Sequence, residues 1–149
     1  MHRQSYPISK RQHPDGSVTR RAWLPIRLVN PEEDAAVRVF ALLDTGADSC
    51  LIPGDITELL SHDLKGDGVE SAVTAGIGGY TVATYKHTFL LQLLSLKTGS
   101  VVWSSPPTLV ECTEACAEEC PPLLGVSDFL RHFTVTVDYP RNAVRLCWQ

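Results

Sequence analysis

Apolar residues recur at every second position along much of this chain, which is the period of a β-strand with one buried face. Residues 36–43 begin apolar on one face and end apolar on both, which predicts a strand that becomes fully buried. Residues 80–94 are β-rich and long enough for two strands or for one long bent strand. Residues 133–138 and 143–148 alternate on either side of a Tyr-Pro-Arg-Asn turn, so we predict a hairpin there.

Helical signals are few. Residues 55–58 have the spacing of a capping box ahead of two leucines. Residues 127–132 are compatible with a second short helix, with Ser127 or Asp128 as its cap. The sequence therefore predicts an all-β domain with one or two short helices, and many short strands in one small chain favour a closed β-barrel.

Composition limits the class of protein. With 149 residues, 44% of them hydrophobic and 20% charged, the chain has the make-up of one folded domain. No apolar run is long enough to cross a bilayer, and no apolar segment follows Met1 as in a secretory signal. We therefore expect no membrane association and take the cytoplasm as the default location. The net charge of −4 argues against general binding of nucleic acid.

The charge is uneven along the chain. Residues 1–21 hold five basic residues against one acid, a net charge of +4, which leaves −8 for residues 22–149. A basic end that contains Pro and Gly is commonly solvated, so we predict a flexible tail over residues 1–21 and a domain over residues 22–149. An arm for an anionic partner, or a targeting role, is the alternative.

An ionisable residue follows directly on the first apolar strand, in the sequence Leu-Leu-Asp44-Thr45-Gly46. A carboxylate at a buried strand end is costly unless it is hydrogen-bonded or protonated. Thr45 offers a hydroxyl, and Gly46 lets the backbone approach the carboxylate or turn with positive φ. Taken alone, the triplet is equally typical of an ordinary turn.

Two further segments follow in order. Residues 75–80, Ala-Gly-Ile-Gly-Gly-Tyr, are glycine-rich, and residues 123–125, Leu-Leu-Gly, precede the strands of the predicted C-terminal hairpin. With the Asp-Thr-Gly-Ala segment, they resemble the flap and the hydrophobic-hydrophobic-glycine segment of retropepsin-like aspartic proteases. The resemblance spans roughly residues 23–148. It implies a closed β-barrel of the retropepsin type with a glycine-rich flap hairpin.

The resemblance also implies an aspartic endopeptidase, in which two carboxylates share a proton and activate a water for attack on a peptide bond. This chain has only one Asp-Thr/Ser-Gly triplet. The second carboxylate must then come from a second subunit, so we predict a homodimer with Asp44 paired across its twofold axis. A polypeptide is the expected substrate, and neither a cofactor nor a metal is required.

Roles for the neighbouring residues also come from the resemblance. Thr45 is expected to brace the two turns, and Gly46 to lie close to the carboxylates. Ala47 and Asp48 are expected to line the substrate cleft, although Asp48 is equally compatible with a salt-bridged or capping aspartate. The flap is expected to close over the peptide, with an ordinary flexible hairpin as the alternative. The flap residues expected to contact substrate are Gly76, Ile77, Gly78 and Gly79.

The sequence departs from the retroviral pattern after Gly125. Val126 and Ser127 follow it, where retroviral enzymes commonly have an arginine that would brace Asp48. Arg131 is the candidate substitute. The departure leaves a second interpretation open, namely a retropepsin-fold module that binds peptide or dimerises with little or no proteolysis.

Three cysteines are regularly spaced. Cys112, Cys116 and Cys120 would share one face of a helix and, with a fourth ligand, bind zinc. The neighbouring glutamates disfavour thiolates, so we favour an acidic loop or helical turn with free thiols, with redox pairing as another alternative, and predict no metal site. An odd total of five cysteines without a secretory signal indicates reduced thiols. Motifs of metalloproteases, serine hydrolases and phosphate-binding loops do not occur.

Overall fold

The computed structural model describes residues 1–149, and nearly all of its regular structure is β-strand. There is one short α-helix, α1 (Gly54–Leu59), and there are two single turns of 3₁₀ helix at Ile77–Gly79 and Leu130–His132. The strands are β1 (His2–Gln12), β2 (Val18–Asn30), β3 (Ala35–Leu43), β4 (Leu51–Pro53), β5 (Ser71–Ala75), β6 (Thr81–Leu94), β7 (Val101–Ser104), β8 (Thr108–Thr113), β9 (Leu123–Leu124), β10 (Thr134–Asp138) and β11 (Ala143–Trp148). The predicted all-β class is confirmed.

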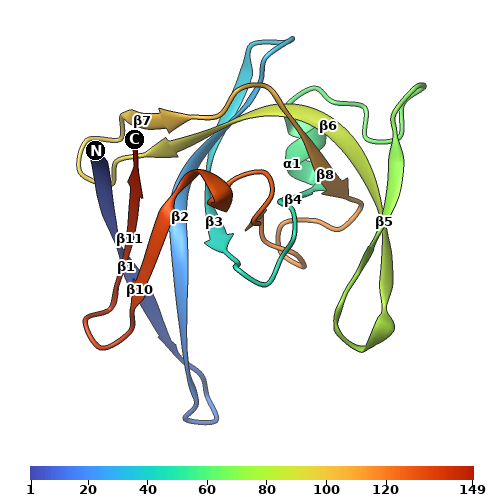
Figure 1. Ribbon diagram of the computed structural model, residues 1–149. Helices are drawn as coiled ribbons and strands as arrows, with labels where there is room; N and C mark the ends of the chain where they lie inside the picture. Colours follow the sequence, from blue (N-terminus) through green and yellow to red (C-terminus); the bar gives the residue numbers. More distant parts are fainter.

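All eleven strands belong to one sheet that returns on itself. The order is β10-β11-β1-β2-β3-β9-β4-β8-β6-β5, with β7 beside β6. Because β2 also pairs with β6, the strands from β2 through β3, β9, β4 and β8 to β6 form a ring (Figure 1). Of the two alternatives predicted for residues 80–94, the structure has the single long strand, β6, which bends past four partners: β5, β8, β2 and β7.

The core lies inside this ring. Alternate residues of β2 point inward, and Leu24, Ile26 and Leu28 are almost completely buried. In the β2–β6 pair Ile26 lies opposite Leu93 and Leu28 opposite Leu91, so the two strands bury matching faces. This packing fixes the position of β3, which also pairs with β2 and is followed directly by Asp44.

The N-terminal residues differ from the solvated tail that the sequence predicts. Residues 2–7 of β1 pair with β11, and residues 8–12 pair with β2. Tyr6 and Ile8 are buried in the core, and the Tyr6 hydroxyl donates to the Leu94 carbonyl at 2.8 Å. These two apolar residues are spaced as in a strand, and their burial stabilises pairing that the surrounding basic residues alone would not favour.

The helical predictions are confirmed only in part. Helix α1 forms where it was predicted, but Pro53 precedes it and no side chain caps it. Asp55 lies inside the first turn, where its carboxylate accepts the Ala117 amide at 3.1 Å, so the predicted capping box is wrong. Residues 127–132 form only the 3₁₀ turn at their end.

The C-terminal hairpin is confirmed as β10–β11. No helix has the length and apolar character that a membrane span needs.

Candidate functional site

Asp44 is the first residue after β3, at the point where the strand leaves the ring. The parallel pairing of β3 with β9 places Leu43 beside Leu124, and the Asp44 amide donates to the Leu124 carbonyl at 3.1 Å. The Asp44 carbonyl in turn accepts the Ala47 amide at 3.2 Å, which closes a tight turn. The last hydrogen bond of β3 therefore fixes the backbone of the aspartate. Only Ala41 of this strand is buried, so the full burial predicted for its end is wrong.

The Asp44 carboxylate is held on one side only. Its Oδ1 accepts the Gly46 amide at 3.0 Å, and Oδ2 has no hydrogen-bond partner within the chain. A Cβ on residue 46 would lie 3.3 Å from Oδ1, so the absence of a side chain leaves room for this approach. Asp44 is half-buried, while Thr45, Gly46 and Asp48 are exposed. The turn thus presents one oriented carboxylate and an open face.

The segment after β9 holds the rest of this turn through its backbone. The Val126 amide donates to the Ala47 carbonyl at 2.9 Å. The Ser127 amide and hydroxyl both donate to the Asp48 carbonyl, at 2.8 and 2.7 Å. Arg131 makes no ion pair with Asp48. Ser127 therefore fixes the backbone of Asp48, and the Asp48 side chain has no partner within the chain.

Gly125 and Asp128 complete this support. A Cβ on residue 125 would lie 2.3 Å from the carbonyl carbon and oxygen of Ser49, so only glycine fits there. The Gly125 amide lies 3.3 Å from Cys50 Sγ, and burial raises the pKa of that thiol to about 12. The Asp128 carboxylate accepts the Cys50 amide at 2.9 Å. These contacts hold the segment after β9 against the end of the turn, just before β4.

The predicted flap is the hairpin between β5 and β6. Its last ladder pair joins Ala75 to Thr81, and the Gly76 amide donates to the Tyr80 carbonyl at 2.7 Å. Gly78 and Gly79 have φ angles of 83° and 79°, in the left-handed region that favours glycine. In Figure 1 this yellow-green hairpin and the teal segment after β3 project from the same side of the molecule.

The tip of the flap is apolar and uncovered. Ile77 is 99% exposed and Tyr80 is 77% exposed, and no hydrogen bond joins the tip to the Asp44 turn. The structure therefore brings together the predicted residues 44–48 in one turn, and it places residues 76–79 apart from them on a separate projecting hairpin. Large apolar side chains that stay exposed commonly mark a surface that another molecule covers.

Comparison with solved structures shows a likeness at the level of the fold. The crystal structure of a retropepsin-like aspartic protease from Rickettsia conorii superposes with a TM-score of 0.63, covering 99% of this chain and 92% of that one. The chain has the retropepsin-like fold. The sequence identity is 15%, so the likeness concerns the fold and leaves activity to be argued from the site. No family model and no curated protein matches the sequence.

Within this retropepsin-like fold, sequence reasoning missed Glu111. It lies in β8, and its carboxylate accepts hydroxyl hydrogen bonds from Ser49 at 2.6 Å, Thr84 at 2.9 Å and Thr74 at 3.2 Å. Burial alone would raise the pKa of Glu111, but the three hydroxyls and the charge of Lys86 lower it overall. The only signal in the sequence is an acid inside an apolar strand, and its partners are 27 to 62 residues away.

The regularly spaced cysteines do not converge in this fold. Cys112 is buried in β8, whereas Cys116 and Cys120 lie in the loop that follows. The alternative of a shared helical face is therefore wrong, because residue 112 belongs to a strand whose pairing with β4 and β6 determines its direction. Residues 116 and 120 lie in a loop, as the favoured interpretation predicts. No group of three or more His, Cys, Asp or Glu side chains is arranged to hold a metal ion. All five thiols are free.

Proposed function

We propose that this chain is an aspartic endopeptidase that hydrolyses peptide bonds as a homodimer. The observation that carries the proposal is the Asp44 carboxylate. One of its oxygens is fixed by the Gly46 amide, and the other is unpartnered on the open face of a turn. The retropepsin-like fold supports the same conclusion.

The chemistry needs a second carboxylate beside the first. Two carboxylates at close range cannot both ionise easily, so one keeps a proton while the other is charged. The charged one accepts a proton from the attacking water, and the protonated one donates to the carbonyl oxygen of the peptide. Each chain supplies one Asp44, so a twofold axis beside the turn completes the pair. In this arrangement the exposed Thr45 of each protomer braces the opposite turn.

The substrate that fits this site is an extended polypeptide. The flap hairpin offers an apolar tip, with Ile77 and Tyr80 free to cover a peptide. Closure of such a lid excludes water and holds the peptide backbone by hydrogen bonds. The side chain of Asp48 lies exposed one residue beyond Ala47 and has no partner within the chain, which leaves it free for a substrate backbone amide.

A second candidate function is a peptide-binding or dimerisation module with little proteolysis. The observation that favours it is the missing arginine after Gly125, which leaves the Asp48 side chain without a cationic partner. The hydrogen bonds from Ser127 support only the backbone of Asp48. The first proposal is preferred because the carboxylate of Asp44 itself is oriented and accessible.

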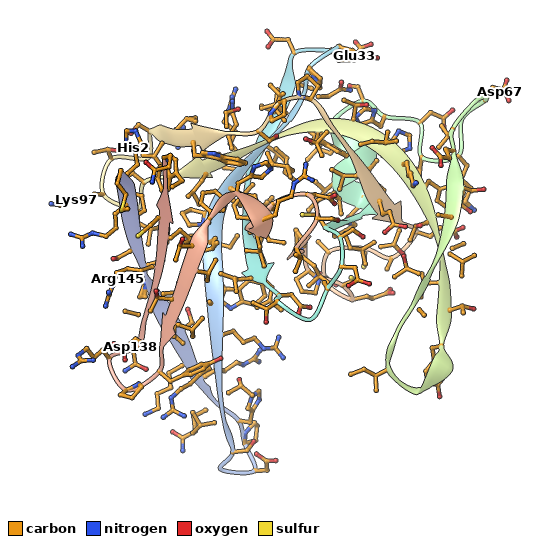
Figure 2. All side chains as sticks on the ribbon, in the orientation of Figure 1. His2, Glu33, Asp67, Lys97, Asp138 and Arg145 are labelled. Atoms are coloured by element: carbon orange, nitrogen blue, oxygen red, sulfur yellow. The ribbon has the colours of Figure 1, made fainter.

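The test compares wild type with Asp44→Asn for cleavage of an unstructured protein such as casein. The range runs from about pH 3 to about pH 8, because the carboxylate pair needs one proton. Asp67→Asn is the matched control, since Asp67 is an exposed carboxylate on a loop tip away from the flap tip (Figure 2). We expect wild type and the control to cleave and Asp44→Asn to be inactive. Equal peptide binding by all three proteins, without cleavage by any, would favour the binding module.

A further inference from the structure

Glu111 joins three segments that are separate in the chain. Its Oε2 accepts the Ser49 hydroxyl from the turn that carries Asp44. Its Oε1 accepts the hydroxyls of Thr74 in β5 and Thr84 in β6, the two strands of the flap hairpin. One half-buried carboxylate therefore binds both the flap and the Asp44 turn.

The strand register shows why these contacts matter for the flap. From residue 84 onward β6 pairs with β8, but residues 81–83 pair only with β5. Strand β5 has no other neighbour. Between Thr84 and its tip the hairpin is thus a two-stranded ribbon, and such ribbons are at best marginally stable by themselves. The Thr84 bond to Glu111 lies at the point where the ribbon leaves the sheet, and the Thr74 bond, opposite Val82, lies within the ribbon.

The carboxylate of Glu111 is chemically suited to link the flap hairpin and the Asp44 turn in a fixed orientation. Hydrogen bonds to an ionised carboxylate are shorter and stronger than bonds between neutral groups, and two oxygens can accept from several donors at once. Lys86, directly opposite Glu111 in the β6–β8 pair, bonds to Glu70 and leaves the carboxylate to the hydroxyls. Glu111 itself sits on β8, which is paired with both β4 and β6 and is therefore well fixed.

We propose that Glu111 is a positioning residue that holds the base of the flap hairpin in register with the Asp44 turn. This role deepens the proposed function, because it controls how the flap closes over a peptide at Asp44. The contacts to Thr74 and Thr84 set the angle at which the hairpin leaves the sheet, and the contact to Ser49 transmits that position to the turn.

The first test needs no catalysis. Hydrogen exchange of wild type is compared with Glu111→Ala, and Glu118→Ala is the matched control, since Glu118 is exposed and has no hydrogen-bond partner. We expect amides of residues 71–83 to exchange about tenfold faster in Glu111→Ala only, because local opening becomes easier there. Glu111→Gln should restore most of the protection, since its amide oxygen still accepts from the threonines. Unchanged exchange in residues 71–83, or equal acceleration over the whole chain, would overturn the proposal.

Thr84→Val keeps the test decisive if Glu111→Ala does not fold. Valine is close to threonine in size and Thr84 is fully buried, so this change removes chiefly the hydroxyl bond to Glu111. Its expected effect is the same local acceleration of residues 71–83, smaller than that of Glu111→Ala. Exchange identical to wild type in these residues would contradict the role of the hydroxyl contacts.

The second test uses kinetics. If the flap opens more readily, the competent closed state is less populated, so apparent substrate affinity falls while chemistry in the closed state is kept. We expect Glu111→Ala to raise KM about tenfold and to change kcat by less than about twofold. A fall in kcat at unchanged KM would overturn the positioning role. A wild-type protein without proteolytic activity would instead remove the proposed function, and the exchange experiment would still decide whether Glu111 ties the flap.

Discussion

Gly125 is the residue at which packing leaves the least freedom. A Cβ there would lie 2.3 Å from two backbone atoms of Ser49, and backbone atoms cannot move aside as the end of a flexible side chain can. We expect Gly125→Ala to lower the free energy of unfolding by about 2–3 kcal/mol, the upper part of the usual range for overpacking. Gly76→Ala is the control, because its Cβ would meet nothing closer than 3.8 Å. Chemical denaturation of both variants provides the measurement, and equal stability would contradict the steric argument.

The cysteines differ in reactivity because they differ in burial. Burial raises the pKa of both Cys50 and Cys112 to about 12, whereas Cys116, Cys120 and Cys147 are partly exposed. Since the thiolate is the reactive form, a thiol reagent at about pH 8 should modify only the three partly exposed cysteines of the folded protein. All five should react in denaturant. Mass spectrometry of the modified peptides identifies the sites, and rapid labelling of Cys50 in the native state would contradict this prediction.

At the scale of single residues, the sequence predicts only what a local motif carries. Asp44, Thr45 and Gly46 are adjacent, so their shared turn can be read from the triplet. Glu111 and Asp128 act on the same turn from 62 and 78 residues away, through Ser49 and the Cys50 amide. Their importance depends on how β8 and β9 are placed beside β4, and no local pattern contains that information.

At the scale of elements, a histidine pair connects the α1–β5 loop to β6. The rings of His62 and His87 lie 4.7 Å apart between centroids, and each has an Nε2 3.0 Å from a backbone carbonyl, of Thr88 and Leu64 respectively. Burial, with a smaller contribution from His87, lowers the pKa of His62 below its ordinary value of about 6.5. The folded state therefore disfavours the charged form of this ring.

This lowered pKa predicts how stability depends on pH. The stabilisation that comes from keeping the His62 ring neutral is fully present above the pKa of that ring in the unfolded chain, about 6.5. This stabilisation is lost as the pH falls through the lower pKa of the ring in the folded protein, because the unfolded chain binds a proton first. The loss should stay below about 1 kcal/mol, because the ring is partly exposed and water screens the effect. We expect Tm to fall less between about pH 7.5 and about pH 5 in His62→Gln than in wild type. His2→Gln, at an exposed position, is the control; an unchanged slope in His62→Gln would contradict the prediction.

Elements were predicted best in the β10–β11 hairpin, where the alternation is uninterrupted, and in β6, which is rich in β-forming residues. The prediction was poorest for β1. Its basic residues indicate solvation, and in the β1–β2 pair Lys10 even lies directly opposite Arg20. Like charges across a strand pair are unfavourable. The burial of Tyr6 and Ile8 offsets this cost. Two buried apolar residues therefore outweigh the basic composition of the segment, and it forms a strand.

At the scale of the whole molecule, a single chain presents an open face. The Asp44 turn and the flap project from the same side of the ring (Figure 1), and Thr45 in the turn and Ile77 and Tyr80 at the flap tip are exposed. A second copy related by a twofold axis beside Asp44 would cover this face and supply the missing carboxylate. The proposed dimer and the proposed chemistry are therefore one hypothesis, and a mixing experiment tests them together.

If each active site needs one Asp44 from each subunit, a dimer of one intact and one Asp44→Asn chain should be inactive. Wild type mixed with an equal amount of Asp44→Asn should retain about a quarter of the activity of the same total amount of wild type, because only a quarter of randomly formed dimers carry two intact carboxylates. Mixing with Asp67→Asn, which keeps Asp44, should leave the activity unchanged. Activity should also rise more steeply than linearly with enzyme at low concentration, as dimers form. Retention of half the activity in the first mixture would mean either that each chain acts alone or that subunits do not exchange. Repeating the mixture after joint unfolding and refolding separates these cases, and half the activity after refolding would contradict the shared site.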